Sequence, residues 1–202
     1  MAVYELAGNR PRIHPSAFVH PLASVAGMVE VGQDCYVGPG ASVRGDWVRI
    51  RIGAGSNVQD CCIIHGAPGF ELILGARAHL GHGCIVHSAT LEDDVLVGMN
   101  AVILDGAVLR TGCVVGSGCV VPGGMEIEAG KLCVGVPGRI VGDVRADLRR
   151  FKTLGTRWYQ QLAARCVRDM HEVPLKACTA GLETEPPEWR DWVAELESYS
   201  AR

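Results

Sequence analysis

Four of the seven histidines in this chain fall within one short and largely apolar region. His79, His82 and His87 lie in the stretch HLGHGCIVHSA, and His65 ends the preceding stretch NVQDCCIIH. Imidazole is a common ligand of transition metals, and three such ligands with an open fourth position describe a catalytic zinc site. A lone histidine is more often an ordinary surface or core residue, so the placement of these side chains must decide between the two interpretations.

The bulk composition narrows the class of protein. A chain of 202 residues with 48% hydrophobic content suits one domain, or one domain with an appendage. A net charge of −3 with mixed signs predicts no nucleic-acid partner, and no apolar run reaches the roughly 18 residues of a membrane span. The segment MAVYELAGNRPR lacks the pattern of a signal peptide, so we expect a cytoplasmic protein whose nine cysteines are reduced.

An aliphatic residue recurs every six positions along most of the chain. Glycine often follows this anchor, and a small residue commonly stands four positions after it. A sustained period of six fits neither an amphipathic helix nor a simple strand, but it is typical of the flat sides of a parallel β-helix. With three sides per turn, we predict an all-β fold with about six coils. The anchors are Ile13, Val19, Val25, Val31, Val37, Val43, Ile52, Val58, Ile64, Leu74, Leu80, Val86, Leu91, Val97, Ile103, Leu109, Val115, Val121 and Ile127.

The period also divides the chain and accounts for most of the cysteines. We predict a β-helix domain over residues 1–142 and a C-terminal helical extension over 143–202. The extension should hold one helix over 143–170 and a second in EPPEWRDWVAELESY, where proline stands at the helix start. The cysteines in the small slot are expected to be packing residues and not zinc ligands, because they lack CxxC spacing; they are Cys35, Cys62, Cys84, Cys113 and Cys119.

The repeat breaks three times, and each break adjoins a polar cluster. Three extra residues follow Val43, four follow Ile64, and one is missing after Val86. Insertions in a solenoid commonly project as loops on a functional face. Ile64 and Val86 are three sides apart, which is one full circuit, so the residues that directly follow them should stack in one column.

Side counting therefore separates the histidines into two groups. His65 and His87 share the column, with Arg44 one circuit below them, whereas His82 lies on another side above Asp60. Within one chain His82 should be too far away to share a metal with the other two. A three-fold trimer of three-sided rods would supply it from a neighbour. We therefore predict an inter-subunit site of His65, His87 and the neighbour's His82 that holds zinc, with iron, cobalt or nickel left open.

The motifs in this region resemble those of the gamma-class carbonic anhydrases over about residues 10–142. They are RGD at 44–46, NVQD at 57–60, IIHG at 63–66 and GHGCIVH at 81–87. The resemblance implies left-handed winding, a homotrimer and the same division of the three ligands between subunits. It also implies an inter-subunit ion pair of Arg44 with Asp60, and a supporting role for Asp46 in the site or the interface.

Two further stretches are similar to one branch of that family, which includes the phenylacetic acid degradation protein PaaY and the carnitine operon protein CaiE. They are VGMNAVILDGAV at 97–108 and GTRWYQQLAARCVRDMHEVPL at 155–175. The resemblance implies hydrolysis of coenzyme A thioesters, especially aromatic intermediates of phenylacetate metabolism, rather than efficient hydration of carbon dioxide.

The expected mechanism uses hydroxide held by the metal against a thioester carbonyl. Gln59 is expected to orient the hydroxide, and His79 is expected to be a neighbour and not a ligand. Trp47 stands where the prototype anhydrase has a glutamate, and the insertion GAPGFE is short, so the usual proton shuttle is missing. Thioesterase activity thus ranks ahead of carbonic anhydrase activity. A hexapeptide acyltransferase and a non-catalytic trimeric scaffold are the remaining alternatives.

Overall fold

The computed structural model describes residues 2–175, 190, 191, 193 and 194. The chain contains two compact units, residues 1–168 and residues 169–202. The first unit holds every element that bears on the histidines. The helix expected in EPPEWRDWVAELESY lies largely outside the described residues, so that expectation stays a prediction.

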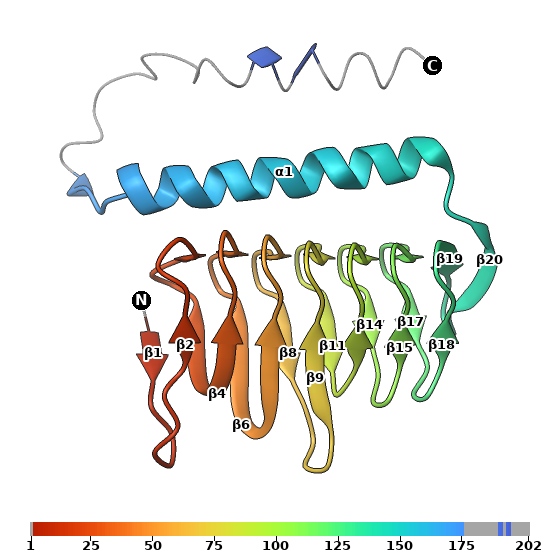
Figure 1. The fold of residues 1–202 in the computed structure, drawn as a ribbon, viewed down its shortest axis with the longest axis horizontal. Helices are drawn as coiled ribbons and strands as arrows, with labels where there is room; N and C mark the ends of the chain where they lie inside the picture. The colour runs from red at the N-terminus through yellow and green to blue at the C-terminus, as the bar shows by residue number, and fades with distance from the viewer. Residues whose placement is uncertain (1, 176–189, 192, 195–202) are drawn as a thin grey trace. The chain divides into compact units, whose positions relative to one another are not determined.

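The first unit is a left-handed parallel β-helix of about seven turns with one helix beside it (Figure 1). The hexad period predicts the parallel β-helix, and the family resemblance implies its left-handed winding. Its strands stack in three columns, which we call the first, second and third sides. The first side contains β1 (Ala2–Tyr4), the first halves of β4 (Ser24–Val31) and β6 (Ser42–Ile52), then β8 (Ile63–His65), β11 (Ile85–His87), β14 (Val102–Ile103) and β17 (Val120–Val121).

The other two sides follow the same rule of one short strand per turn. The second contains β2 (Arg12–Ile13), the second halves of β4 and β6, then β9 (Glu71–Leu74), β12 (Thr90–Leu91), β15 (Val108–Leu109) and β18 (Glu126–Ile127). The third contains β3 (Phe18–Val19), β5 (Tyr36–Val37), β7 (Asn57–Val58), β10 (His79–Leu80), β13 (Leu96–Val97), β16 (Val114–Val115), β19 (Lys131–Val134) and the antiparallel β20 (Arg139–Asp143).

The aliphatic anchors form the core of the coils. Every anchor from Val19 to Ile127 is buried, and the five cysteines predicted to be packing residues are buried free thiols. Leu80 shows the arrangement, since it pairs in register with Val58 on one side and Val97 on the other. The turns number about seven instead of about six, because β1 precedes the first anchor on the first side and β19 continues the third side beyond the last anchor.

The corner between the first and second sides departs from the regular coil. β6 runs without interruption from Ser42 to Ile52, so the first insertion, expected to project as a loop, is strand throughout. The second insertion does form a loop, at residues 66–70 between β8 and β9. Both irregularities therefore place polar residues at one corner of the prism.

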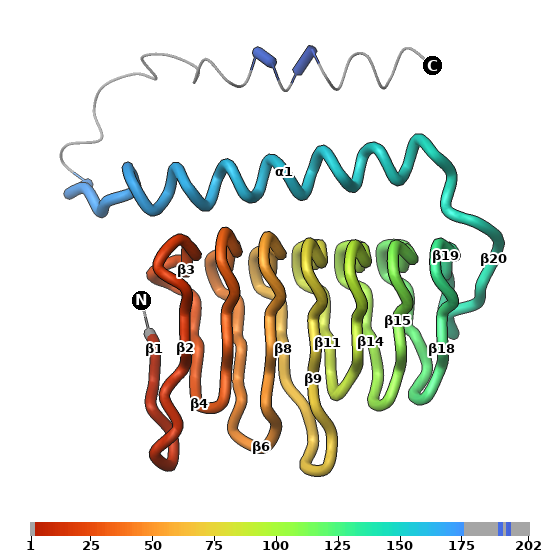
Figure 2. The backbone as a smooth tube through the Cα atoms, in the orientation of Figure 1, coloured from red at the N-terminus to blue at the C-terminus, as the bar shows by residue number. Residues whose placement is uncertain are grey.

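Helix α1 (Ala146–Asp169) covers the third side. It starts beside the last coil and runs back along the stack toward the first (Figure 2). Near the far end Ala163 packs against Phe18 and Tyr36, and Gln160 Nε2 donates to the carbonyl of Gly55 at 3.0 Å. The predicted helix over 143–170 is confirmed. The boundary expected between 142 and 143 stays a prediction, although strand ends at Asp143 and helix begins at Ala146.

Leu80→Ala tests the importance of the anchors. Leu80 is fully buried in the middle of the stack, so we expect truncation to lower the free energy of unfolding by about 2–5 kcal/mol. Chemical denaturation measures the change. Leu22→Ala, at a leucine that is 75% exposed, is the matched control and should change the free energy little. Equal losses in the two variants would contradict a core built on the anchors.

Candidate metal centre

His65 and His87 lie side by side on adjacent strands. β8 and β11 pair in parallel with Ile64 opposite Val86 and His65 opposite His87, which confirms the predicted column. The two ring centroids are 5.2 Å apart, and Nδ1 of His65 lies 3.3 Å from Nε2 of His87. One nitrogen of each ring therefore faces the same small volume.

The outer nitrogen of each ring contacts a carboxylate. Nε2 of His65 lies 2.8 Å from Oδ1 of Asp46, and Nδ1 of His87 contacts Oδ1 of Asp105. Burial works to raise the pKa of Asp46, but the hydrogen bond from His65 and the charge of Arg44 outweigh it and hold that pKa below its usual value. The hydrogen bond from His87 is the main cause that lowers the pKa of Asp105.

These contacts assign the tautomers of the two rings. An ionised carboxylate only accepts hydrogen bonds, so in the neutral imidazoles the outer nitrogens carry the protons. Both inner nitrogens then present lone pairs to each other at 3.3 Å. Two facing lone pairs repel unless a proton or a cation lies between them. Carboxylate-bound histidines of this kind are typical of metal sites, where the carboxylate fixes the ring and raises its basicity.

His82 lies at a different corner, as the side count predicts. It follows β10 on the third side, and its Nδ1 contacts Oδ2 of Asp60, one circuit below. Its Nε2 is 3.5 Å from the hydroxyl oxygen of Tyr159 on α1. Within the part of one chain that the structure describes, no group of three histidine, cysteine, aspartate or glutamate side chains is placed to hold a metal ion. Assigning His82 to the same site thus requires a second chain and stays a prediction.

The remaining predicted residues divide between the two corners. Arg44 Nη1 lies 2.8 Å from Asp46 Oδ2, so in one chain it supports the His65 corner. Asp60 contacts His82, and its expected pairing with Arg44 of a neighbour stays a prediction. Trp47 is 63% exposed, and its ring centroid is 5.8 Å from that of His65. An apolar ring therefore adjoins the paired imidazoles.

Gln59 is buried and turned toward the helix. Its amide nitrogen donates to Oδ1 of Asn57 at 2.9 Å and lies 2.8 Å from Nε2 of His79. Nδ1 of His79 is 3.2 Å from the hydroxyl of Thr156 on α1. The amide nitrogen that would donate to a hydroxide is therefore engaged elsewhere in this chain, and the catalytic role of Gln59 stays a prediction.

Sequence reasoning missed two residues that the structure brings to these histidines. Asp105 stands two positions after the anchor Ile103, and stacking the loops of its corner would have placed it one turn beyond His87. Tyr159 gave no such signal, because its contact with His82 depends on how α1 docks. Burial raises the pKa of Tyr159 to about 12, so its hydroxyl stays protonated at neutral pH.

Comparison with known proteins agrees with the repeat and the motifs. Residues 88–123 match the model of the bacterial transferase hexapeptide family (six repeats). The carnitine operon protein CaiE of Escherichia coli K12 is 44% identical over 177 residues, which cover 87% of this chain and 90% of CaiE. The chain belongs to the CaiE-type, gamma-carbonic anhydrase-like branch of the hexapeptide-repeat family.

Solved structures of this hexapeptide-repeat family share the fold. A putative acetyltransferase from Bacillus cereus superposes with a TM-score of 0.81 at 31% identity, covering 82% of this chain and 96% of its own. A hexapeptide transferase family protein from Anaplasma phagocytophilum superposes with a TM-score of 0.77 at 27% identity, covering 80% of this chain and 96% of its own. No helix in the described part of our chain has the length and apolar character to cross a bilayer.

His79 provides a test of the buried network next to the candidate site. Burial, assisted by the charge of Lys152, lowers the pKa of His79 to about 3. Below pH 6.5 the unfolded chain therefore binds a proton that the folded chain does not, so stability should fall as the pH falls. Between pH 6.5 and 5 this group should cost about 2 kcal/mol. Denaturation of the wild type and of His79→Asn at both pH values measures the difference.

His79→Asn should lose this part of the pH dependence. His14→Asn, at an exposed histidine, is the control and should keep the wild-type slope. An unchanged slope in His79→Asn would contradict a neutral, partly buried His79.

Proposed function

We propose that this protein is a metal-dependent hydrolase of acyl-CoA thioesters, with aromatic acyl groups of phenylacetate metabolism as its substrate class. The observation that carries the proposal is the pair of carboxylate-bound imidazoles whose free nitrogens face each other at 3.3 Å. Membership in the CaiE-type branch supports it.

The residues fit zinc. Two nitrogens that bind one tetrahedral zinc ion at about 2.0–2.1 Å are separated by about 3.3 Å. Nδ1 of His65 and Nε2 of His87 have this separation. Iron, cobalt and nickel also accept imidazole, so the donor set favours zinc without selecting it alone.

The third ligand would come from a neighbour in a trimer. His65 and His87 lie where the first side meets the second, and His82 lies where the third side meets the first. In a trimer, the first side of each of the three chains would face a common axis. The edge of one chain that carries His65 and His87 would then lie against the edge of the neighbouring chain that carries His82. Members of the hexapeptide-repeat family are typically trimers, which supports this arrangement.

The chain's own groups would prepare such a site. Zinc bound by three imidazoles supplies hydroxide at neutral pH and polarises a carbonyl oxygen. Asp46, Asp105 and Asp60 each contact one nitrogen of a candidate ligand histidine and so direct the lone pair to the other nitrogen, which in His82 lies 3.5 Å from the hydroxyl oxygen of Tyr159. Tyr159 offers a protonated hydroxyl beside His82. The exposed ring of Trp47 would form an apolar wall for an acyl group.

Carbonic anhydrase activity is the first alternative, because a metal held by the same three histidines would also supply the chemistry of carbon dioxide hydration. Rapid hydration also requires a proton shuttle. Trp47 replaces the acidic residue of the prototype, and the insertion GAPGFE is short, with its acidic side chain, Glu71, 3.7 Å from Arg51. These features favour the thioesterase.

An acyltransferase is the second alternative, and the acetyltransferase described for the Bacillus cereus structure favours it. Such an enzyme passes the acyl group to an acceptor, whereas a thioesterase passes it to water. A trimeric scaffold in which the metal only joins subunits is the third, and a metal-loaded trimer inert toward thioesters and carbon dioxide would support it.

Thiol release without an acceptor separates these alternatives. Purified protein should release CoA from phenylacetyl-CoA in buffer alone, and it should contain one metal ion per chain by elemental analysis. Removal of the metal with a chelator should abolish release, and zinc should restore it. Release that persists in fully metal-free protein would exclude the mechanism, and release that needs an added amine or alcohol would indicate a transferase.

Mixed trimers test the shared site. His65→Ala, His82→Ala and His87→Ala should each lose metal and activity, whereas His14→Ala should keep both. Chains of His65→Ala and His82→Ala, unfolded and refolded together in equal amounts, should regain about one quarter of the sites, because a site then draws intact ligands from different chains.

Chains of His65→Ala and His87→Ala provide the matched negative mixture. They should regain no sites, since both ligands come from one chain. Equal recovery in the two mixtures would contradict the proposed partition.

A further inference from the structure

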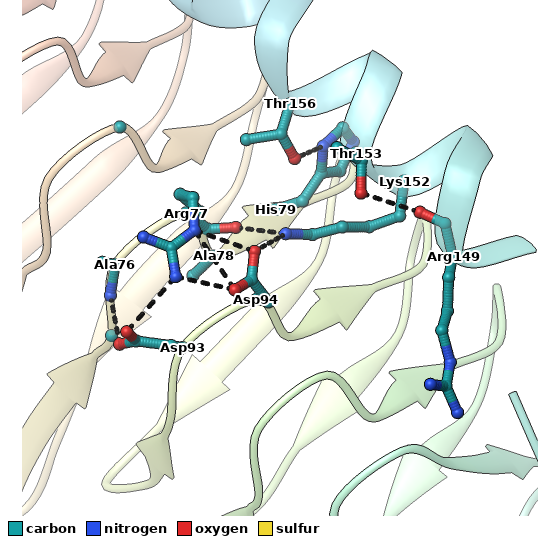
Figure 3. Close-up of polar contacts among 12 residues, drawn as sticks. Ala76, Arg77, Ala78, His79, Asp93, Asp94, Arg149, Lys152, Thr153 and Thr156 are labelled. Atoms are coloured by element: carbon teal, nitrogen blue, oxygen red, sulfur yellow. Dashed lines mark hydrogen bonds and ion pairs between the residues drawn. The ribbon is translucent and has the colours of Figure 1, made fainter.

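A cavity lined by charged side chains lies beneath the first turns of α1. It has a volume of about 470 Å³ and opens between the helix and three loops at the corner between the second and third sides. Figure 3 shows Arg149, Lys152 and Thr153 on the helix side, with Asp94 on the coil side. Thr111 and Gly130 also line it, and we call it the Arg149 pocket.

Lys152 brings a buried ammonium group to this pocket. Its side chain is 5% exposed, and Nζ donates to the carbonyl of Arg77 at 2.7 Å and to Oδ1 of Asp94 at 3.0 Å. An ammonium group carries three protons, so one donor remains after these two bonds. Burial is the main cause that lowers the pKa of Lys152. A further anion near Nζ would oppose this effect, because an opposite charge stabilises the ammonium form.

The charges around the pocket leave one cation without a partner. Arg77 holds both oxygens of Asp94, at 3.0 Å from Nε and 2.7 Å from Nη2, and also contacts Asp93. Arg77 and Lys152 thus balance the two carboxylates. Among the described residues, no hydrogen bond or ion pair holds the guanidinium of Arg149, although its charge helps to lower the pKa of Asp143, whose carboxylate pairs with Lys131. A single positive charge therefore remains at the mouth of the pocket.

Gly130 leaves room for that guanidinium. Its φ is +68°, and a Cβ at this position would lie 3.1 Å from Nη2 of Arg149. A side chain here would be strained and would crowd the arginine. The turn and the helix together keep Arg149 over the cavity.

We propose that the Arg149 pocket binds a phosphate monoester of about nucleotide size. Arginine presents a planar fork of donors that matches phosphate oxygens, and the free proton of Lys152 adds a further charged donor. The cavity falls within the range of small-molecule sites and exceeds what a phosphate alone would fill. Val114 and Ala129, which also line it, would contact the organic part.

This site is separate from the metal centre. Its loops follow strands of the second side, β12, β15 and β18, whereas His65 and His87 end strands of the first side. The residues that contact the three candidate ligands, among them Asp46, Asp60, Asp105 and Tyr159, do not line it. The inference therefore does not rest on the proposed function.

Calorimetric titration of the full chain with adenosine monophosphate, inorganic phosphate and adenosine tests the pocket. Adenosine monophosphate should bind, phosphate should bind more weakly, and adenosine should not bind. Arg149→Gln should weaken binding of the nucleotide by about tenfold or more, since it removes the guanidinium that faces the pocket. Arg149 is exposed, so this variant should fold. Arg145→Gln removes the same charge one turn earlier, where Arg145 pairs with Asp147 outside the pocket, and it should bind like the wild type.

The contrary results are equally definite. Failure of both phosphate compounds to bind, or equal weakening in Arg149→Gln and Arg145→Gln, would overturn the proposal. Inorganic phosphate should leave the KM for phenylacetyl-CoA unchanged. If added phosphate raises that KM, and Arg149→Gln raises it as well, the pocket would bind a phosphate group of the CoA part of the substrate. That result would overturn the separation of the two sites.

Discussion

Parallel strand pairing in register is the constraint on which this protein's chemistry depends. Paired strands lie about 4.8 Å apart, so any residue one full circuit from another must lie directly beside it. Ile64 and Val86 are fully buried and paired, and the residues that follow them must therefore emerge together at one corner. The separation of 3.3 Å between the facing nitrogens of His65 and His87 follows from this stacking. The core and the candidate metal centre are consequences of one repeat.

Carboxylates then determine how the imidazoles are oriented. Each of the three candidate ligands contacts an aspartate through one nitrogen, and the three aspartates come from neighbouring turns of the same stack. Because an ionised carboxylate attracts the ring proton, the other nitrogen is left as a lone pair. Two facing lone pairs repel each other unless a proton or a cation lies between them. The arrangement is understandable when a cation is shared.

Helix α1 connects parts of the stack that the coils keep apart. It covers the third side from the last turns to the first, with Lys152 at Asp94, Thr156 at His79 and Tyr159 at His82. The helix thereby contacts the face that leads to one candidate ligand and also forms one wall of the Arg149 pocket. Two candidate sites at different corners thus depend on the docking of a single element.

The sequence by itself determined the period, the three sides, the buried cysteines and the shared column of His65 and His87, because in a solenoid side counting replaces long-range geometry. It did not determine that β6 continues as strand through its insertion, that Gln59 turns toward His79, or that Asp105 and Tyr159 reach the histidines. Nor did it indicate the Arg149 pocket. These features depend on side-chain direction at an irregular corner and on the position of a helix that packs against residues far away in the chain. A local period carries no information about either, so only the tertiary structure decided them.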